Sequence, residues 1–323
     1  MDSKFSIIIP VKQINNFIKE NVSAIIAGSY QSFEIIILVD NKENNESFPK
    51  TRIIETGKIG PAEKRDIGAN KANGEFLAFI DDDVYPSKDW LLNALNFFEN
   101  KNISAVCGPG VTPVNDNVMQ KVSGWISATV LGGGPYTYRF IPKKERFVDD
   151  FPSMNFIIRK KDFIRINGFD SNYWPGEDTK LCLELIKLNK KIIYSPKVLV
   201  YHHRRPIFKK HLIQNGNYGI HRGYFAKILP QTSFRLSYFI PSLFAFGFIF
   251  GPLFYFINRE VFNFYLFIVG LYFSFVIISS SYILIKEKNL FIALLYIPAI
   301  ISTHLYYGIK FIQGYLFTKK LIK

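Results

Sequence analysis

The sequence predicts an α/β domain with a parallel sheet, followed by a set of apolar helices that cross a membrane. Up to about residue 205, apolar runs of strand length alternate with helical segments, and charged residues are mixed among them. After about residue 236, charged residues nearly vanish. We therefore expect three regions: a soluble α/β domain over residues 1–205, a basic interfacial segment over 206–235, and a transmembrane region over 236–323.

The first 110 residues predict an alternation of strands and helices. A helix over residues 15–28 would place Phe17, Val22, Ile25 and Ile26 inward. A second helix would begin at Pro61, because proline suits a first helical turn, and end at Gly74. The apolar runs expected to form strands are residues 5–11, 33–40, 51–56 and 76–80.

The middle of the chain gives fewer signals. Residues 131–150 are rich in glycine and then basic, which is typical of a mobile loop over a site or of a long surface connection. Residues 156–170 predict a strand and a short helix that ends at Gly168. Residues 176–190 predict a helix with a leucine face, and residues 191–203 predict two short strands.

Three uncharged or nearly uncharged stretches predict membrane spans. They cover residues 236–258, 261–285 and 289–309, and each reaches the roughly 20 residues that cross a bilayer core. None shows the polar face of a soluble core helix. The amino terminus does not read as a signal peptide, so we expect a multi-pass protein of the cytoplasmic or inner membrane, with its first domain in the cytoplasm.

Net charge is +14, and much of it comes from the residues just before the first predicted span. Residues 202–211 are basic, and Arg222, Lys227 and Arg235 follow. Basic residues that flank a span favour the cytoplasmic side and anionic lipid, so we expect residues 206–235 to form interfacial helices on membrane lipids. No nucleic-acid motif accompanies this charge, which argues against a nucleic-acid partner. The two cysteines, Cys107 and Cys182, have no metal-site spacing and are expected to be reduced.

Three consecutive aspartates, Asp81–Asp83, follow the apolar strand 76–80. Asp40 likewise follows the strand at 33–40, and ligands of parallel sheets bind beyond the carboxyl ends of strands, so these groups can share one crevice. Adjacent carboxylates repel one another unless a cation or polar partners compensate. A solvated turn that caps the next helix is the alternative for an isolated acidic run.

Five segments follow one another over residues 5–205: "FSIIIPV", "EIIILVD", "KRDIGANKANGEFLAFIDDD", "GED" and "HHRRP". This ordered set resembles the inverting family 2 glycosyltransferases, which have the Rossmann-like GT-A nucleotide-sugar-binding fold. The apolar tail resembles that of membrane-anchored members. The resemblance implies a nucleotide-diphosphate sugar as donor, and a diphosphate beside aspartates needs a divalent cation, for which hard oxygen ligands favour Mg²⁺ or Mn²⁺.

The resemblance also assigns donor-site residues. It implies that Asp83 is a direct metal ligand and that Asp81 binds the ribose and the metal shell. Asp40 would contact the base or ribose, and Pro10 would contact the base through its backbone. Arg65 would pair with a phosphate or with Asp81. The family's Arg-Asn-x-Gly stretch reads "RDIG" here, with Asp66 in place of Asn, and a turn role remains the alternative for Asp40.

Two carboxylates, Glu177 and Asp178, stand directly before a predicted helix. An inverting transfer needs a base for the acceptor hydroxyl, and the positive end of a helix dipole stabilises an ionised carboxylate. The resemblance implies that Asp178 is this base and that Glu177 positions the acceptor or a loop. Helix capping by Asp178 is the alternative.

The segment "YHHRRP" follows a strand, and alternation points His202 and His203 to opposite faces. The resemblance favours His202 near the metal and Arg205 on the diphosphate, while a basic cluster on lipid headgroups is an alternative or additional role. Asn155 resembles a residue of the family's acceptor side.

These expectations describe a membrane-anchored enzyme that moves one sugar from a nucleotide-diphosphate sugar to a lipid-linked or saccharide acceptor. A nucleotide-sugar-binding protein or a nucleotidyltransferase of similar fold is the alternative, since it would keep the donor site without needing a base. A transporter is disfavoured because His304 is the only ionisable residue, apart from tyrosines, in the three predicted spans. A processive synthase would need more spans and a Gln-x-x-Arg-Trp segment.

Overall fold

The computed structural model describes residues 4–42 and 46–321, which form two compact units. The first unit contains the chain up to Val111 together with Tyr138–His203, and the second contains Thr112–Thr137 together with the chain from Arg204 to Leu321. The division near residue 204 lies close to the expected boundary at 205. The segment Thr112–Thr137 departs from the expectation, because it belongs with the apolar C-terminal helices. The expected third region runs to residue 323, and its last two residues lie outside the described part.

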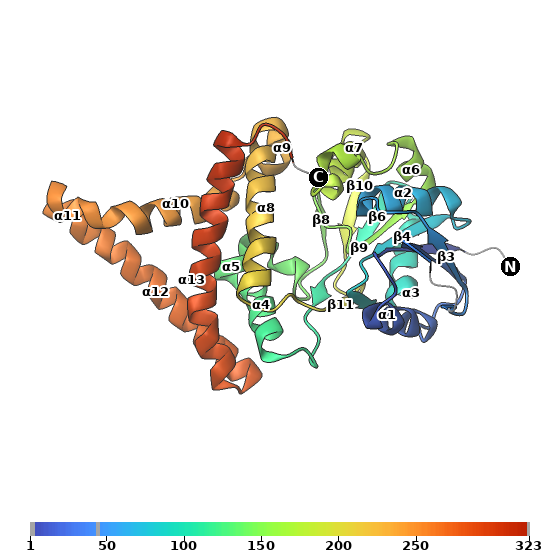
Figure 1. The fold of residues 1–323 in the computed structure, drawn as a ribbon, viewed down its shortest axis with the longest axis horizontal. Helices are drawn as coiled ribbons and strands as arrows, with labels where there is room; N and C mark the ends of the chain where they lie inside the picture. Colours follow the sequence, from blue (N-terminus) through green and yellow to red (C-terminus); the bar gives the residue numbers. More distant parts are fainter. Residues whose placement is uncertain (1–3, 43–45, 322–323) are drawn as a thin grey trace. The chain divides into compact units, whose positions relative to one another are not determined.

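An eight-stranded sheet is the centre of the first unit (Figure 1). Its order is β3-β2-β1-β4-β9-β6-β10-β8. The strands are β1 (Phe5–Pro10), β2 (Phe33–Val39), β3 (Thr51–Glu55), β4 (Phe76–Ile80), β6 (Ile103–Cys107), β8 (Arg146–Val148), β9 (Asn155–Arg159) and β10 (Lys191–Tyr194). The four strands β3, β2, β1 and β4 are parallel, as the alternation predicts, but β9 runs antiparallel between β4 and β6. The sheet is therefore mixed rather than parallel throughout.

Helix α2 (Pro61–Lys71) lies against β1 and β2. A Cβ at Gly68 would come within 2.7 Å of Ile8 Cγ2 and 3.0 Å of Leu38 Cδ2, so this position needs glycine for the helix to approach the sheet. Lys64 and Arg65 precede Gly68 by four and three residues and share its inward face. This packing thus places two positively charged side chains, those of Lys64 and Arg65, against the sheet. The other helices of this unit are α1 (Asn16–Ile26), α3 (Trp90–Leu95), α6 (Lys160–Arg165) and α7 (Glu177–Lys187).

A second, three-stranded sheet of order β5-β11-β7 also belongs to the chain. It consists of β5 (Val84–Pro86), β7 (Gly110–Val111) and β11 (Val200–His202). Strand β11 pairs antiparallel with β5, and the register sets His202 opposite Val84. The residue before Val84 is Asp83, so this pairing brings the acidic run beside the histidines.

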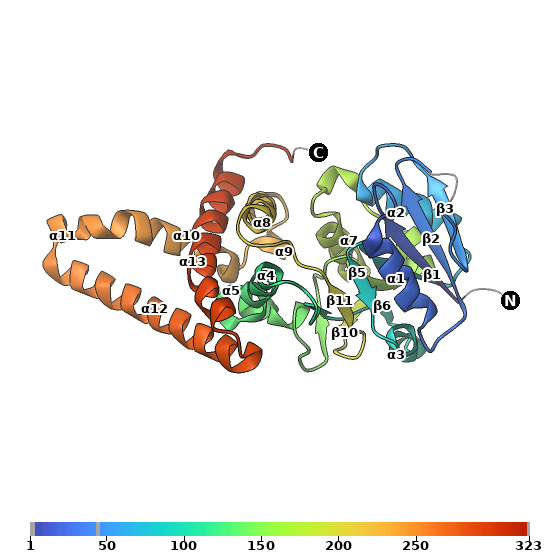
Figure 2. The ribbon, with the colours of Figure 1, turned by 60° about the horizontal axis from the view of Figure 1, so that its bottom comes forward.

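The second unit consists of helices: α4 (Val118–Ala128), α5 (Val130–Gly133), α8 (Lys209–Ile228), α9 (Pro230–Ser233), α10 (Leu236–Phe250), α11 (Phe254–Ile257), α12 (Arg259–Glu287) and α13 (Leu290–Ile312). Three helical stretches are long and apolar enough to cross a membrane, namely Leu236–Ile257, Arg259–Glu287 and Leu290–Phe317. The three spans expected from the sequence are confirmed at this level of length and composition. Figure 2 shows α10 and α12 joined through α11.

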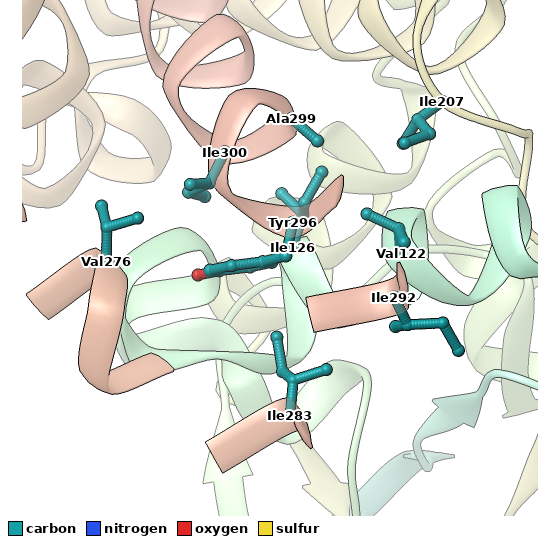
Figure 3. Packing of buried hydrophobic residues seen from close by; sticks show 9 residues of the cluster. All are labelled: Val122, Ile126, Ile207, Val276, Ile283, Ile292, Tyr296, Ala299 and Ile300. Carbon is teal, nitrogen blue, oxygen red and sulfur yellow. The ribbon is translucent and has the colours of Figure 1, made fainter. Parts of the chain in front are cut away.

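Helix α4 joins this unit through a buried apolar cluster, shown in Figure 3. Val122 and Ile126 of α4 pack with residues of α12 and α13, and the buried Tyr296 hydroxyl lies 2.9 Å from Thr129 Oγ1. At the end of α12, Glu287 accepts a hydrogen bond from Trp125 Nε1 at 2.8 Å. The apolar face of α4 has its partners on α12 and α13, which explains why a boundary drawn from composition misses this segment. The glycine-rich stretch after it is partly ordered as α5 and a 3₁₀ turn at Gly134–Arg139.

Helices α8 and α13 run side by side in both ribbon views (Figures 1 and 2). Glycine residues at the contact allow the two helix backbones to come close together. A Cβ at Gly223 would lie 2.1 Å from Phe311 O, and one at Gly314 would lie 2.0 Å from Ile220 O. Small residues let helix backbones meet in this way. The segment expected to form interfacial helices thus also packs its glycine face on a candidate span.

Replacement of Gly223 by Ala is expected to lower the thermal stability of the purified chain. The added methyl group would collide with backbone atoms, which cannot rotate away, and such overpacking costs about 1–3 kcal/mol. Gly270→Ala is the matched control, because no atom lies within 4 Å of a Cβ built there. The melting temperatures of both variants, measured in one detergent, check the contact. Equal melting temperatures would contradict it.

Candidate active site

A buried arginine links the acidic run to the start of α7. Arg65 is 4% exposed. Its Nη2 donates to Asp81 Oδ1 at 2.6 Å, and its Nη1 donates to Glu177 Oε1 at 3.0 Å. Three residues far apart in sequence thereby form one network, and the expected pairing of Arg65 with Asp81 is present in the structure.

Glu177 lies inside the protein rather than at an open surface. It is 5% exposed, and its second oxygen accepts the backbone N–H of Gly176 at 2.9 Å. Burial, together with the charge of Asp178, raises the pKa of Glu177 to about 7, against the lowering effect of Arg65. This placement makes Glu177 a positioning residue that holds Arg65 and the turn before α7.

The stability of the chain is expected to depend on pH through Glu177. Its pKa in the folded chain, about 7, lies above the ordinary value of 4.5, so the folded state holds the proton more tightly. The resulting stabilisation is complete below pH 4.5 and is lost as the pH rises through 7. The Glu177→Gln variant has no carboxyl that titrates at this position. Its free energy of unfolding, compared with that of wild type at the same pH, should therefore increase from pH 5 to pH 8. Thermal unfolding of both proteins at several pH values tests this, and a constant difference would contradict it.

Asp178 occupies a different environment from its neighbour. It is partly exposed in the first turn of α7, and its Oδ1 accepts the N–H of Thr179 at 2.7 Å. The N-cap position of α7 belongs to Gly176, not to Asp178. The structure therefore places an accessible carboxylate at the positive end of an 11-residue helix, beside the Arg65 network.

Asp83 and His202 face each other across the β5–β11 pairing. His202 Nε2 lies 3.4 Å from Asp83 Oδ1, and both side chains are partly exposed. His203 N donates to Asp83 O at 3.0 Å, while its ring nitrogen Nε2 lies 2.9 Å from Glu20 Oε2. The two histidines thus have different partners, and His202 is the one beside the acidic run.

The site offers some, but not all, of the ligands that a divalent cation needs. A carboxylate oxygen and an imidazole nitrogen are ligands that Mn²⁺ accepts, and Mg²⁺ binds through few carboxylates while keeping several waters. Over residues 4–42 and 46–321, however, no three His, Cys, Asp or Glu side chains are grouped to hold a metal ion. Asp81 is engaged by Arg65. The donor set therefore consists of Asp83 and His202, with Asp81 beside it, and would be completed by oxygens of a ligand or water.

Asp82 and Asp66 have structural partners. Asn15 Nδ2 donates to Asp82 Oδ2 at 3.1 Å, and burial together with the charge of Asp83 raises the pKa of Asp82 to about 6. Asp66 Oδ1 accepts the N–H of Phe169 at 2.9 Å. The Asp at the family's Asn position thus fixes the turn at Gly168, where φ is +70°.

Asp40 is paired with a lysine that the sequence interpretation missed. The Lys64 ammonium forms an ion pair with Asp40 Oδ1 and donates to Val11 O at 2.5 Å. Lys64 is 3% exposed. The helical spacing of Lys64 from Gly68 is the signal that could have found it. Pro10, the neighbour of Val11, is buried at the end of β1, opposite Leu38.

Asn155 lies inside the fold rather than at an exposed surface. Its side chain is fully buried, accepts from Trp90 Nε1 at 2.8 Å and donates to Gly108 O and Val198 O, both at 2.8 Å. All three bonds tie chain segments together, so the expected acceptor role is replaced by a structural one. Arg205 is exposed and belongs to the second unit, so its expected contact with a diphosphate stays a prediction.

Comparisons with known proteins agree with this geometry. The model of "Glycosyl transferase family 2" matches residues 6–166. A Methanococcus voltae enzyme is 24% identical over 286 residues, 85% of this chain and 82% of its own length. Its name is dolichyl N-acetyl-alpha-D-glucosaminyl phosphate 3-beta-D-2,3-diacetamido-2,3-dideoxy-beta-D-glucuronosyltransferase. A pre-mycofactocin glycosyltransferase of Mycobacterium tuberculosis is 29% identical over 162 residues, which are 50% of this chain but only 33% of that protein.

A solved structure shares the fold along almost the whole chain. It is a mannosyltransferase from Pyrobaculum calidifontis, in complex with GDP-Man and Mn²⁺, with a TM-score of 0.58 and 15% identity. The match covers 99% of this chain and 89% of that one. The predicted GT-A-like fold is thereby confirmed. The match of the family model to residues 6–166 shows that this chain belongs to glycosyltransferase family 2.

Proposed function

We propose that the chain is a metal-dependent, inverting glycosyltransferase that moves one sugar from a nucleotide-diphosphate sugar to a lipid-linked acceptor at the cytoplasmic face of a membrane. One observation carries the proposal. The accessible carboxylate of Asp178 stands next to Glu177, and Arg65 joins Glu177 to the acidic run that ends beside His202. A base for the acceptor and a place for the donor diphosphate are thus parts of one network.

The chain's own groups suggest how transfer proceeds. Asp83 and His202 would hold a divalent cation that, when bound, neutralises the charge on the leaving diphosphate. Asp178 would accept the proton of the acceptor hydroxyl as this hydroxyl attacks the anomeric carbon. Arg65 keeps Asp81 in place and, through Glu177, fixes the first turn of α7 that presents Asp178. Attack from the face opposite the diphosphate inverts the anomeric centre.

The lipid-linked acceptor is supported by the spans and by the relatives. Three helical stretches suit a membrane, and the Methanococcus voltae relative and a glucosyl-dolichyl phosphate glucuronosyltransferase of Haloferax volcanii carry dolichyl phosphate in their names. The second relative is 23% identical over 203 residues. A saccharide acceptor without a lipid is the alternative for the same site.

Mass spectrometry of lipid extracts tests the proposal. Purified full-length chain is incubated with membrane lipids of its source, a panel of nucleotide sugars, and Mn²⁺ or Mg²⁺. The expected result is one lipid product that is heavier by a single sugar and absent when EDTA is added. Donor binding without any product, lipid or soluble, would favour the nucleotide-sugar-binding alternative over the enzyme.

A further inference from the structure

The second unit is strongly basic for its size. Residues 112–137 and 204–321 contain fourteen Lys and Arg but three acidic residues, Asp116, Glu260 and Glu287. Asp116 accepts the N–H of Arg204, and Glu287 pairs with Lys121. From residue 201 to residue 259 the chain has no Asp or Glu at all. This excess of positive charge favours an anionic binding partner for residues 201–259.

Within this stretch, two arginines gather with hydroxyl groups where α10 begins. We name Tyr136, Arg222, Arg235, Ser237 and Tyr238 the α10 entry cluster. The Tyr136 and Tyr238 rings stack at 5.2 Å, and the Arg222 guanidinium lies 5.0 Å from the centre of the Tyr238 ring. The Tyr136 hydroxyl lies 3.5 Å from Ser237 Oγ.

The pKa of Tyr136 responds to the hydroxyl groups of the cluster and to its arginine charge. Burial raises the pKa of Tyr136, but hydrogen bonds with Ser237 and Tyr238 and the charge of Arg235 together bring it below its ordinary value. Arg222 Nη1 also donates to Ser233 Oγ at 3.3 Å, and Arg235 Nη2 donates to Gln231 O at 3.5 Å. Both are long bonds to neutral oxygen atoms, which pair with a guanidinium less strongly than an anion does.

The position of the cluster fits a group at a membrane surface. Arg235 is the residue directly before the first candidate span, and the 15-residue α10 turns its positive end toward this point. Tyr136, Arg222 and Arg235 are all partly exposed. Beneath them, Tyr238 packs on Ala226 and Phe311, so the polar groups rest on an apolar base.

We propose that the α10 entry cluster binds the phosphate of the lipid-linked acceptor. This proposal rests on the proposed function, since it names where that acceptor is held. Guanidinium groups pair with phosphate oxygens through paired N–H bonds, and the hydroxyls of Tyr136 and Ser237 add donors. The isoprenoid or acyl chain of such a lipid would lie along the apolar helices. The cluster thus distinguishes a lipid phosphate from the corresponding lipid alcohol.

Equilibrium binding to the full-length chain in detergent tests the assignment. The probe is radiolabelled C55 polyprenyl phosphate, with C55 polyprenol as the neutral analogue and dioleoylphosphatidylglycerol as a competitor. Wild type should bind the phosphate about tenfold or more tightly than the alcohol. Arg222→Gln and Arg235→Gln should each remove most of this preference, and Arg→Lys at the same positions should restore part of it. A charged hydrogen bond of ordinary strength accounts for an effect of this size.

Arg259→Gln is the matched control. Arg259 also borders a candidate span and lies 4.9 Å from the centre of the Tyr255 ring, but it is outside the cluster. An equal loss in this variant would overturn the proposal, because general surface charge would then explain it. Competition by phosphatidylglycerol as strong as by unlabelled polyprenyl phosphate would also overturn it, since the site would then hold bilayer lipid rather than the acceptor.

The two proposals fail in different ways. Sugar transfer in variants whose phosphate preference is unchanged would leave the proposed function standing and remove the site. Cluster-dependent phosphate binding in a chain that transfers no sugar would keep the site and remove the proposed function. Unchanged binding of nucleotide sugar to each variant serves as the check that it is folded.

Discussion

Asp178→Asn is expected to reduce sugar transfer by about 10²–10⁴-fold, the usual contribution of a general base, while the chain keeps its affinity for the nucleotide sugar. Asn has almost the same shape as Asp, and its side-chain oxygen can still accept the Thr179 N–H that Asp178 accepts at 2.7 Å. It cannot take up the proton of an acceptor hydroxyl. The structure around α7 should therefore survive, and only the chemical step should be lost.

Glu184→Gln is the control for this measurement. Glu184 lies on the same helix, but it pairs with Lys180 and Lys187 at the surface. Initial rates of transfer and equilibrium binding of the donor are compared for wild type and the two variants. Transfer by Asp178→Asn at a rate close to that of wild type would show that another group is the base.

Arg65→Met is expected to destabilise the first unit and to abolish transfer. The methionine fills similar space but leaves Glu177, which is 5% exposed, without its cation. Breaking one partner out of a buried pair costs about 3–5 kcal/mol, because Glu177 is then buried either as an unpaired charge or, after taking up a proton, as a carboxyl that has lost its donor. Arg65→Lys keeps the charge but cannot reach Asp81 and Glu177 together through two nitrogens, so an intermediate loss is expected.

A second substitution separates stability from chemistry. Arg65→Met combined with Glu177→Gln removes both charges of the buried pair, so part of the lost stability should return while transfer stays low. Chemical denaturation and donor binding of the single and double variants check this. A double variant as unstable as Arg65→Met alone would show that the Arg65–Glu177 pair does not carry the effect.

Local patterns in the sequence predict the parallel half of the sheet well. Strands buried on both faces are continuous apolar runs, and β1, β2 and β4 begin or end within a residue or two of the expected limits. The position of Asp81–Asp83 beyond a strand follows from the same pattern. These features depend on neighbours in sequence, which is why sequence alone reveals them.

Features that depend on long-range pairing are not visible in this way. Strand β5 has three residues, and only its pairing with β11 brings Asp83 to His202. The role of Lys64 on α2 is visible only from its ion pair with the Asp40 carboxylate, which directly follows β2. Asn155 looks like an acceptor residue by position, but the fold uses its amide to bind Gly108 and Val198. The partners of the apolar face of α4 on α12 and α13 come 150 or more residues later.

The most direct test of the account is calorimetric titration of UDP and GDP into wild type and Asp83→Asn, with Mn²⁺ and with EDTA. The account predicts that wild type binds at least one nucleotide with Mn²⁺, and that EDTA or the substitution weakens this binding about tenfold or more. Equal affinity under all four conditions would contradict the claim that the acidic run and His202 hold a nucleotide diphosphate through a divalent cation.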